Sequence, residues 1–197
     1  MKLRYCILIL LAVLTTTACG QNAPAPKANE TPAAASPAPP EDANRVYILD
    51  RKISFVPPEG FKQMTDAEMD KKYPDQENAP QLAYRSNDGE ATVALRITNQ
   101  PLEIAQLPEL KGVLSKHMET TVPGLKWIRK DMIAINGGSW LKMEATSQDK
   151  KEKLYNDMYF TAFQGRMLGM NFNATVDRYP KLKAALEACR DSVQVLP

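Results

Sequence analysis

The side chains best suited to chemistry in this sequence are its single histidine and its three cysteines. His117 and Cys189 are the types that form a base and nucleophile pair, in which an imidazole takes the thiol proton. However, His117 precedes Met118 at the border of a helical apolar stripe, and Cys189 continues the stripe of Leu182 and Leu186. A free cysteine in such a stripe packs as a small core residue and is unreactive. We therefore expect Cys189 to serve core packing and His117 to be a helix-packing or surface histidine.

No metal or cofactor motif accompanies these side chains. One histidine cannot make a histidine-rich metal site, and no HExxH or cysteine cluster supplies other ligands. The sequence also has no G-x-S-x-G elbow, Walker-type loop or dinucleotide fingerprint. We predict no cofactor and no metal. The enzymatic alternative is an envelope hydrolase whose site uses carboxylates such as Glu144 and Asp157 on neighbouring strands.

Cys19 offers a different chemistry, namely covalent attachment. Two basic residues, Lys2 and Arg4, precede an uncharged apolar run, and small residues follow it up to Cys19. This layout is typical of an export signal, and the run is too short to span a bilayer. One interpretation is cleavage after Ala18 by a general signal peptidase. The alternative, which we favour, is lipidation of Cys19.

The residues before Cys19 resemble a bacterial lipobox, the motif that precedes the lipid-modified cysteine of a lipoprotein. Ala18 and Cys19 match the motif, whereas Thr16 stands where leucine is usual and Leu14 lies two positions early. Gly20 follows the cysteine, which in enteric-type bacteria favours sorting to the outer membrane. The resemblance implies that the protein contacts a membrane through a lipid on Cys19 and faces the periplasm.

Composition divides the chain into three parts. Residues 1–18 are the predicted signal peptide, and residues 19–44 are the lipidated cysteine with a Pro/Ala-rich tether that lacks the apolar bulk to fold. Residues 45–197 have the size and composition of a single globular domain. Without Lys2 and Arg4, the basic residues balance the 23 acidic ones, so no basic field attracts nucleic acid.

The pattern of the globular part predicts an α+β domain. We expect a short strand pair within residues 46–61, a capped helix within 65–74 and a hairpin that turns at Asp88-Gly89. A helix over about 107–120 follows, then a meander of three or four strands with tight turns at Asn136-Gly137 and Gln164-Gly165. A helix over about 179–191 and a brief final strand end the domain. Both faces of the meander are largely apolar, so we expect an antiparallel sheet with helices packed on both faces.

This succession of elements resembles the PsbP-like superfamily over about residues 46–197. The resemblance rests on "ISFVPPEGF" before the "TDAEMDKKYP" helix, then on the "NDGEATVALRIT" and "AINGGSWLKMEATSQ" hairpins and the closing "YPKLKAALEACRDSVQVL". With the N-terminal anchor, the DcrB-type periplasmic lipoproteins are the nearest match. The resemblance implies a sandwich fold and a non-enzymatic adaptor, chaperone or assembly factor, and it carries over no functional residue.

Aromatic and methionine side chains gather in the meander. Trp140, Tyr155 and Tyr159 are our candidate partner-binding residues, because aromatic surfaces rich in methionine suit adaptable binding. The alternative, which we favour, is that most of them fill the two cores of the sheet. The leading hypothesis is therefore an exported, lipid-anchored protein that binds an envelope protein. The alternatives are the hydrolase described above and a carrier of a small apolar ligand in a closed cavity.

Overall fold

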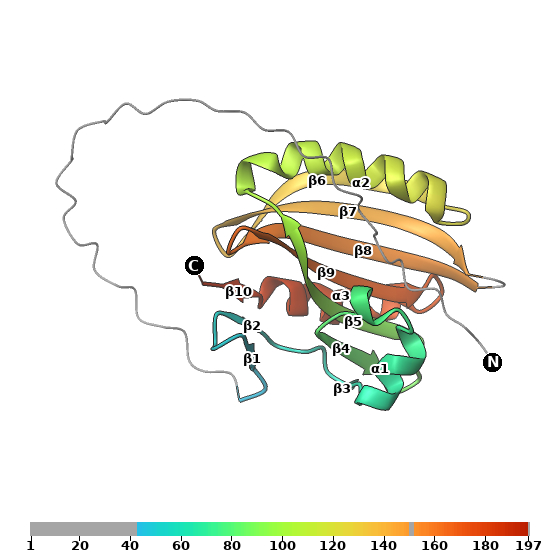
Figure 1. Cartoon of the computed structure of the whole chain (residues 1–197). Coiled ribbons are helices and arrows are strands. Elements are labelled where there is room, and N and C mark those ends of the chain that lie inside the picture. The colour runs from blue at the N-terminus through green and yellow to red at the C-terminus, as the bar shows by residue number, and fades with distance from the viewer. Residues whose placement is uncertain (1–42, 150–151, 197) are drawn as a thin grey trace, which may run out of the picture.

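A seven-stranded antiparallel sheet forms the centre of the domain in the computed structural model, which describes residues 43–149 and 152–196. Its strand order is β3-β4-β5-β9-β8-β7-β6 (Figure 1). The strands are β3 (Phe61–Gln63), β4 (Leu82–Ser86), β5 (Ala91–Pro101), β6 (Lys126–Ile135), β7 (Gly138–Asp149), β8 (Glu152–Phe163) and β9 (Arg166–Thr175). Strands β6 to β9 pair with one another in chain order as antiparallel hairpins, which confirms the predicted meander.

A second, smaller sheet joins the two ends of the domain. It consists of β1 (Val46–Ile48), β2 (Ile53–Phe55) and β10 (Gln194–Val195), with β2 in the middle. The backbone N–H of Val56 donates to Ser192 Oγ at 2.7 Å, which ties this sheet to the segment before β10. The predicted pairing of β1 with β2 is confirmed, and the final strand β10 was also predicted. The addition of β10 to this pair as a separate sheet and the short strand β3 were not predicted.

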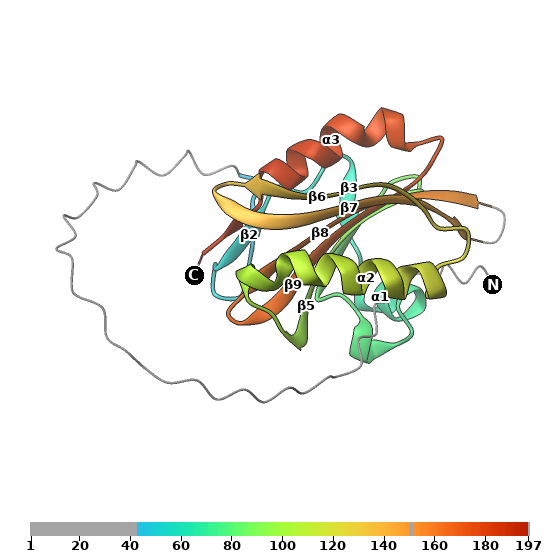
Figure 2. The ribbon, with the colours of Figure 1, turned by 90° about the horizontal axis from the view of Figure 1, so that it is seen from above.

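Helices cover both faces of the large sheet, so the predicted α+β class and layering are confirmed. Figure 2 shows α3 (Tyr179–Asp191) on one side of the sheet, with α1 (Asp66–Lys72) and α2 (Leu107–Thr121) on the other. Two single 3₁₀ turns, Gln76–Asn78 and Ile104–Gln106, precede β4 and α2. Within the described residues, no helix is long and apolar enough to cross a membrane.

Each face of the sheet has its own core, because successive side chains of a strand point to opposite sides. On β8, Tyr159 and Phe163 belong to the core under α3, whereas Met158 and Phe160 belong to the core under α2. The residues of α2 that fill the second core recur at helical spacing; they are Leu107, Leu110, Leu114 and Met118. The large sheet is therefore the middle layer of a sandwich.

Local sequence explains where several of these elements begin and turn. Thr65 caps α1, and the Glu68 carboxylate accepts a hydrogen bond from the Thr65 backbone N–H, so the predicted capping box is confirmed.

The predicted signal peptide and the tether up to residue 42, with Cys19 in it, lie outside the described residues.

Candidate functional site

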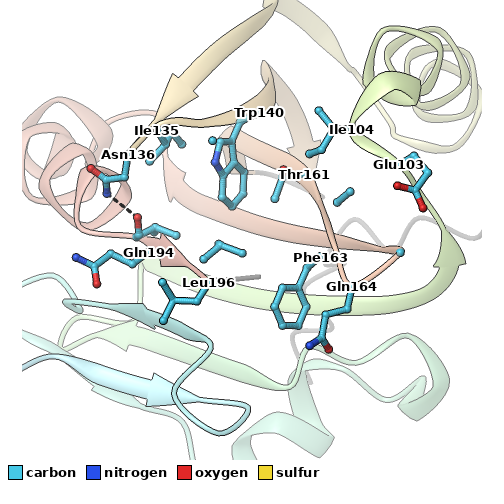
Figure 3. Close-up of a pocket in the computed structure, with 15 residues that line it drawn as sticks. Glu103, Ile104, Ile135, Asn136, Trp140, Thr161, Phe163, Gln164, Gln194 and Leu196 are labelled. Carbon is cyan, nitrogen blue, oxygen red and sulfur yellow. Dashed lines mark hydrogen bonds between the residues drawn. The ribbon is translucent and has the colours of Figure 1, made fainter. Parts of the chain in front are cut away.

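An open groove of about 820 Å³ lies at one end of the sandwich (Figure 3). Its walls come from four segments that are distant in sequence. They are the tip of the β6–β7 hairpin, the tip of the β8–β9 hairpin, the Glu103–Ile104 step before α2, and residues 193–196 around β10. We call this feature the end groove.

Two tight turns build the hairpin tips of the end groove. Asn136 and Gly137 have φ angles of 47° and 81°, and Gln164 and Gly165 have φ angles of 50° and 72°. Two successive residues with positive φ make the type I′ turn, whose twist suits a two-residue hairpin. Asparagine and glycine tolerate this conformation best, which is why Asn136-Gly137 could be recognised from sequence as a turn.

The Asn136 side chain fastens one tip to the chain that follows α3. Its Nδ2 donates to the carbonyl oxygens of Asp191, at 2.9 Å, and Val193, at 2.6 Å. At the other tip, the Leu102 N–H donates to the Gly165 carbonyl at 3.0 Å and holds the β5 exit in place. Hydrogen bonds from both sides therefore hold the shape of the end groove.

The lining of the end groove is mainly apolar. Trp140 and Phe163 lie at its inner wall and are each only 2% exposed, whereas Ile104 and Leu196 on its rim are 45% and 55% exposed. Glu103 is the only side chain among the lining residues that carries a charge at neutral pH. An apolar hollow with few polar groups is the usual form of a binding site.

A buried ionic cluster lies on the α3 side of the sheet. Lys142 Nζ is 3.1 Å from Glu144 Oε2 and 3.3 Å from Asp157 Oδ1, and all three residues are at most 8% exposed. The Tyr159 hydroxyl donates to Asp157 Oδ2 at 2.7 Å, and Arg190 Nη1 of α3 donates to the Tyr159 hydroxyl oxygen at 3.4 Å. We call these five residues the ionic cluster.

Burial and contacts set the protonation of the ionic cluster. Desolvation raises the pKa of Asp157, against the opposing influence of the Tyr159 hydrogen bond and the Lys142 charge. Burial, followed by the Asp157 charge, also raises the pKa of Tyr159, so its hydroxyl stays protonated and remains a donor.

The ionic cluster contains the two carboxylates of the hydrolase alternative. Glu144 and Asp157 are direct cross-strand partners on β7 and β8, so the predicted neighbour relation is confirmed. Their charges, however, are directed at Lys142, and neither residue lines the end groove. The arrangement suits internal charge compensation better than attack on a substrate, which needs a pocket beside the reacting groups.

The three predicted partner-binding residues are mostly enclosed. Trp140 and Tyr159 are 2% and 1% exposed, and the half-buried Tyr155 stacks on Tyr179 of α3 with ring centroids 3.5 Å apart. Their positions agree with the core-filling alternative. Only Trp140 borders the end groove, and partner binding by these three side chains stays a prediction.

His117 and Cys189 lie on opposite sides of the sheet, His117 on α2 and Cys189 on α3. The sheet therefore separates the proposed base from the proposed nucleophile. Burial raises the pKa of the Cys189 thiol to about 12, which matches the predicted packing role. Across residues 43–149 and 152–196, no group of three or more histidine, cysteine or acidic side chains could hold a metal ion.

The residues that shape the end groove were not predicted from the sequence as a site. Ile104, Leu196 and Glu103 were not singled out, and Asn136 was recognised only as part of a turn. An exposed aliphatic residue carries little signal by itself, because apolar atoms are common on protein surfaces. Their significance comes from their meeting at one end of the sandwich.

The carrier alternative predicts a closed cavity between sheet and helix. The end groove is open to solvent (Figure 3), as is a second hollow of about 900 Å³ between α3 and the Pro57–Phe61 loop. The two smaller hollows on the sheet, of about 70 and 40 Å³, are too small for a sizeable ligand. None of these four hollows has the predicted form.

Comparison with known proteins identifies the fold. No protein-family model and no curated protein matches the sequence. Among solved structures, cyanobacterial PsbP (CyanoP) from Synechocystis sp. PCC 6803 is similar, with a TM-score of 0.58 at 12% identity over 82% of this chain and 98% of that chain. LpqN from Mycobacterium tuberculosis, described as involved in cell envelope biogenesis, gives a TM-score of 0.54 at 14% identity over 74% and 83%. The domain therefore has the PsbP-like fold.

Proposed function

We propose that this protein is an exported, non-enzymatic binding protein of the cell envelope that holds a partner protein in the end groove. The observation that carries the proposal is the end groove itself, an apolar hollow with exposed Ile104 and Leu196 on its rim and Glu103 as its one charge. The ionic cluster supports it, because the convergent carboxylates face a buried lysine rather than this hollow. The envelope role described for LpqN is consistent with the proposed location.

A lipid on Cys19 is the second part of the proposal. Support comes from the export signal, the lipobox-like residues and the Pro/Ala-rich tether, which would let the domain reach away from a membrane. Cells expressing Cys19→Ala are expected to lose both palmitate label and membrane association. The matched control is Cys6→Ala, which keeps Cys19 and is expected to retain label. If Cys19→Ala still fractionates with membranes and the wild type carries no lipid, the anchor is refuted.

In-cell photo-crosslinking tests the groove directly. A photoreactive amino acid placed at Ile104 or Leu196 is expected to give discrete crosslinked products with an envelope protein. The same substitution at Val113 is the control, because Val113 is also an exposed aliphatic residue, at 41%, but lies on α2 away from the groove lining. Equal products from all three positions would indicate non-specific contact and refute the groove as the binding site.

A second experiment asks whether the apolar rim is needed. Ile104→Asp and Leu196→Asp put a charge on exposed positions, so the fold is expected to tolerate them within about 0.5 kcal/mol. Each is expected to remove the crosslink made from the other rim position, because a charge at the rim must be desolvated when the partner binds. Val113→Asp is expected to leave both crosslinks intact.

A further inference from the structure

One wall of the end groove is an edge of the small sheet. The order of that sheet is β1-β2-β10, so among residues 43–149 and 152–196 no strand pairs with β10 on the side away from β2. Residues 193–196, which include β10, line the end groove. The inference below rests on the proposed function and concerns the kind of partner segment that this wall would hold.

The register shows which backbone groups face the groove. The Leu196 N–H donates to the Lys52 carbonyl at 2.7 Å, and Val195 lies opposite Ile53. In an antiparallel pair, the N–H and C=O of successive residues point alternately toward and away from the neighbouring strand. Because the groups of Leu196 point toward β2, the N–H and C=O of Val195 point away from it.

A neighbouring contact identifies the side to which Val195 points. The Val193 carbonyl, two residues earlier and therefore on the same edge, accepts a hydrogen bond from Asn136 Nδ2 across the groove wall (Figure 3). The Val195 groups are the next pair along this edge. They consequently present one backbone donor and one backbone acceptor at the edge of β10 that lines the groove.

We propose that the end groove binds an extended, largely apolar peptide segment of the partner, which adds to β10 as a fourth strand of the small sheet. An extended peptide brings backbone donors and acceptors that match those of Val195, and its alternate side chains reach the apolar lining at Trp140 and Phe163. A helix satisfies its own backbone internally, so it would leave the Val195 groups without partners. Glu103 is the single charged lining residue, so a lysine or arginine in the segment complements the groove.

Proline substitution at Val195 is a sharp test. Proline removes the N–H that faces the groove, and it costs no ladder hydrogen bond to β2 because that N–H does not point to β2. Val195→Ala is the matched control, since it also shortens the side chain but keeps the N–H. Both variants of the full chain, purified in detergent, are first checked for a wild-type circular dichroism spectrum and melting transition.

The probe is a short fluorescein-labelled peptide of alternating valine and threonine with one lysine, followed by fluorescence polarisation. Wild type and Val195→Ala are expected to bind it with affinities within about threefold, whereas Val195→Pro weakens binding by about fivefold or more. A peptide with methylated backbone nitrogens tests the same hydrogen bonds on unaltered protein and is expected to lose affinity similarly. Glu103→Gln is expected to remove the preference for the lysine peptide over its glutamate counterpart.

Strand addition is overturned if the parent peptide does not bind wild type. It is equally overturned if wild type binds the methylated peptide as tightly as the unmethylated one. The same holds if Val195→Pro binds the unmethylated peptide as tightly as wild type does. These outcomes are separate from failure of the proposed function. Crosslinks from Ile104 and Leu196 that persist without peptide binding would keep the groove as a binding site and reject only the added strand. Absence of both would reject the proposed function as well.

Discussion

Replacement of Lys142 by methionine is expected to destabilise the domain strongly at neutral pH. The ammonium group lies 3.1 Å from one buried carboxylate and 3.3 Å from another, and Lys142 itself is 7% exposed. Methionine preserves most of the side-chain volume but leaves Glu144 and Asp157 beside each other without the ammonium group that contacts both. Breaking a buried ion pair by removing one partner costs about 3–5 kcal/mol.

This free energy corresponds to a large change in melting temperature. For a domain of this size, about 1 kcal/mol shifts the melting temperature by roughly 2–4 °C, so Lys142→Met is expected to melt about 6–20 °C below wild type. The control is Lys183→Met. Lys183 is 55% exposed and contacts Glu187 at 4.0 Å, and an exposed pair of this kind contributes about 0.5 kcal/mol.

The loss is expected to depend on pH. Burial already raises the pKa of Asp157 above 3.8, and removal of Lys142 takes away an influence that lowers it. A carboxyl whose pKa is higher in the folded state favours folding at low pH, and this contribution is lost as pH rises through the folded value. Lys142→Met is therefore expected to be less destabilised at pH about 5 than at pH about 8. Urea unfolding at both pH values measures the difference.

Two results would refute this reasoning. A free energy of unfolding within about 1 kcal/mol of wild type at pH 8 would show that the carboxylates do not depend on Lys142. A loss that is the same at both pH values would show that packing, and not charge, causes it. If the charge explanation holds, adding Glu144→Gln and Asp157→Asn to Lys142→Met should restore much of the stability, because no uncompensated charge is left.

Three further predictions concern packing, acid stability and thiol reactivity. Leu114→Ala removes a fully buried side chain of α2 and is expected to cost about 2–5 kcal/mol in urea unfolding, whereas exposed Val113→Ala should change the free energy of unfolding by less than about 0.5 kcal/mol. Hydrogen bonds from Ser86 and the Glu90 N–H lower the pKa of Asp88 to about 2, so the stability contributed by the ionised carboxylate should be lost as pH falls from about 4 toward 2. In acid titrations of stability, Asp88→Asn should lose less stability over this pH range than wild type does. Burial raises the pKa of the Cys189 thiol to about 12, so this thiol should resist thiol reagents at neutral pH until the domain is unfolded in urea. The test uses Cys6→Ala/Cys19→Ala protein, in which Cys189 is the remaining cysteine. Rapid labelling of this variant in its folded state would contradict the burial of Cys189.

Much of the fold was predictable because its signals are local. The capping box of Thr65 and Glu68, the turn at Asn136-Gly137 and the helical recurrence of Leu107, Leu110 and Leu114 each depend on neighbours within a few residues. The two apolar faces of β8 likewise predicted that helices cover both sides of the sheet. The strand β3 was missed because Phe61 is its only apolar residue, whereas the equally short β1 and β2 consist mainly of β-branched and aromatic residues.

The ionic cluster was only partly predictable. Sequence alternation places Lys142 and Glu144 on the same face of β7, and the neighbouring position of Asp157 was anticipated. Burial of all three was not, because charged residues are usually exposed unless they are paired. The pairing depends on the β7–β8 register, and the contact with Arg190 depends on where α3 packs.

The sequence by itself determined the periodicities, the turns and the core faces of strands and helices, and it predicts that Cys19 carries a lipid. Only the tertiary structure decided that a groove exists and which residues form it. Asn136 and Val193 are 57 positions apart, yet the hydrogen bond between them closes one wall of the end groove. The physical reason is that periodicity reflects interactions within one element, whereas a groove and a free strand edge depend on how distant elements pack against each other.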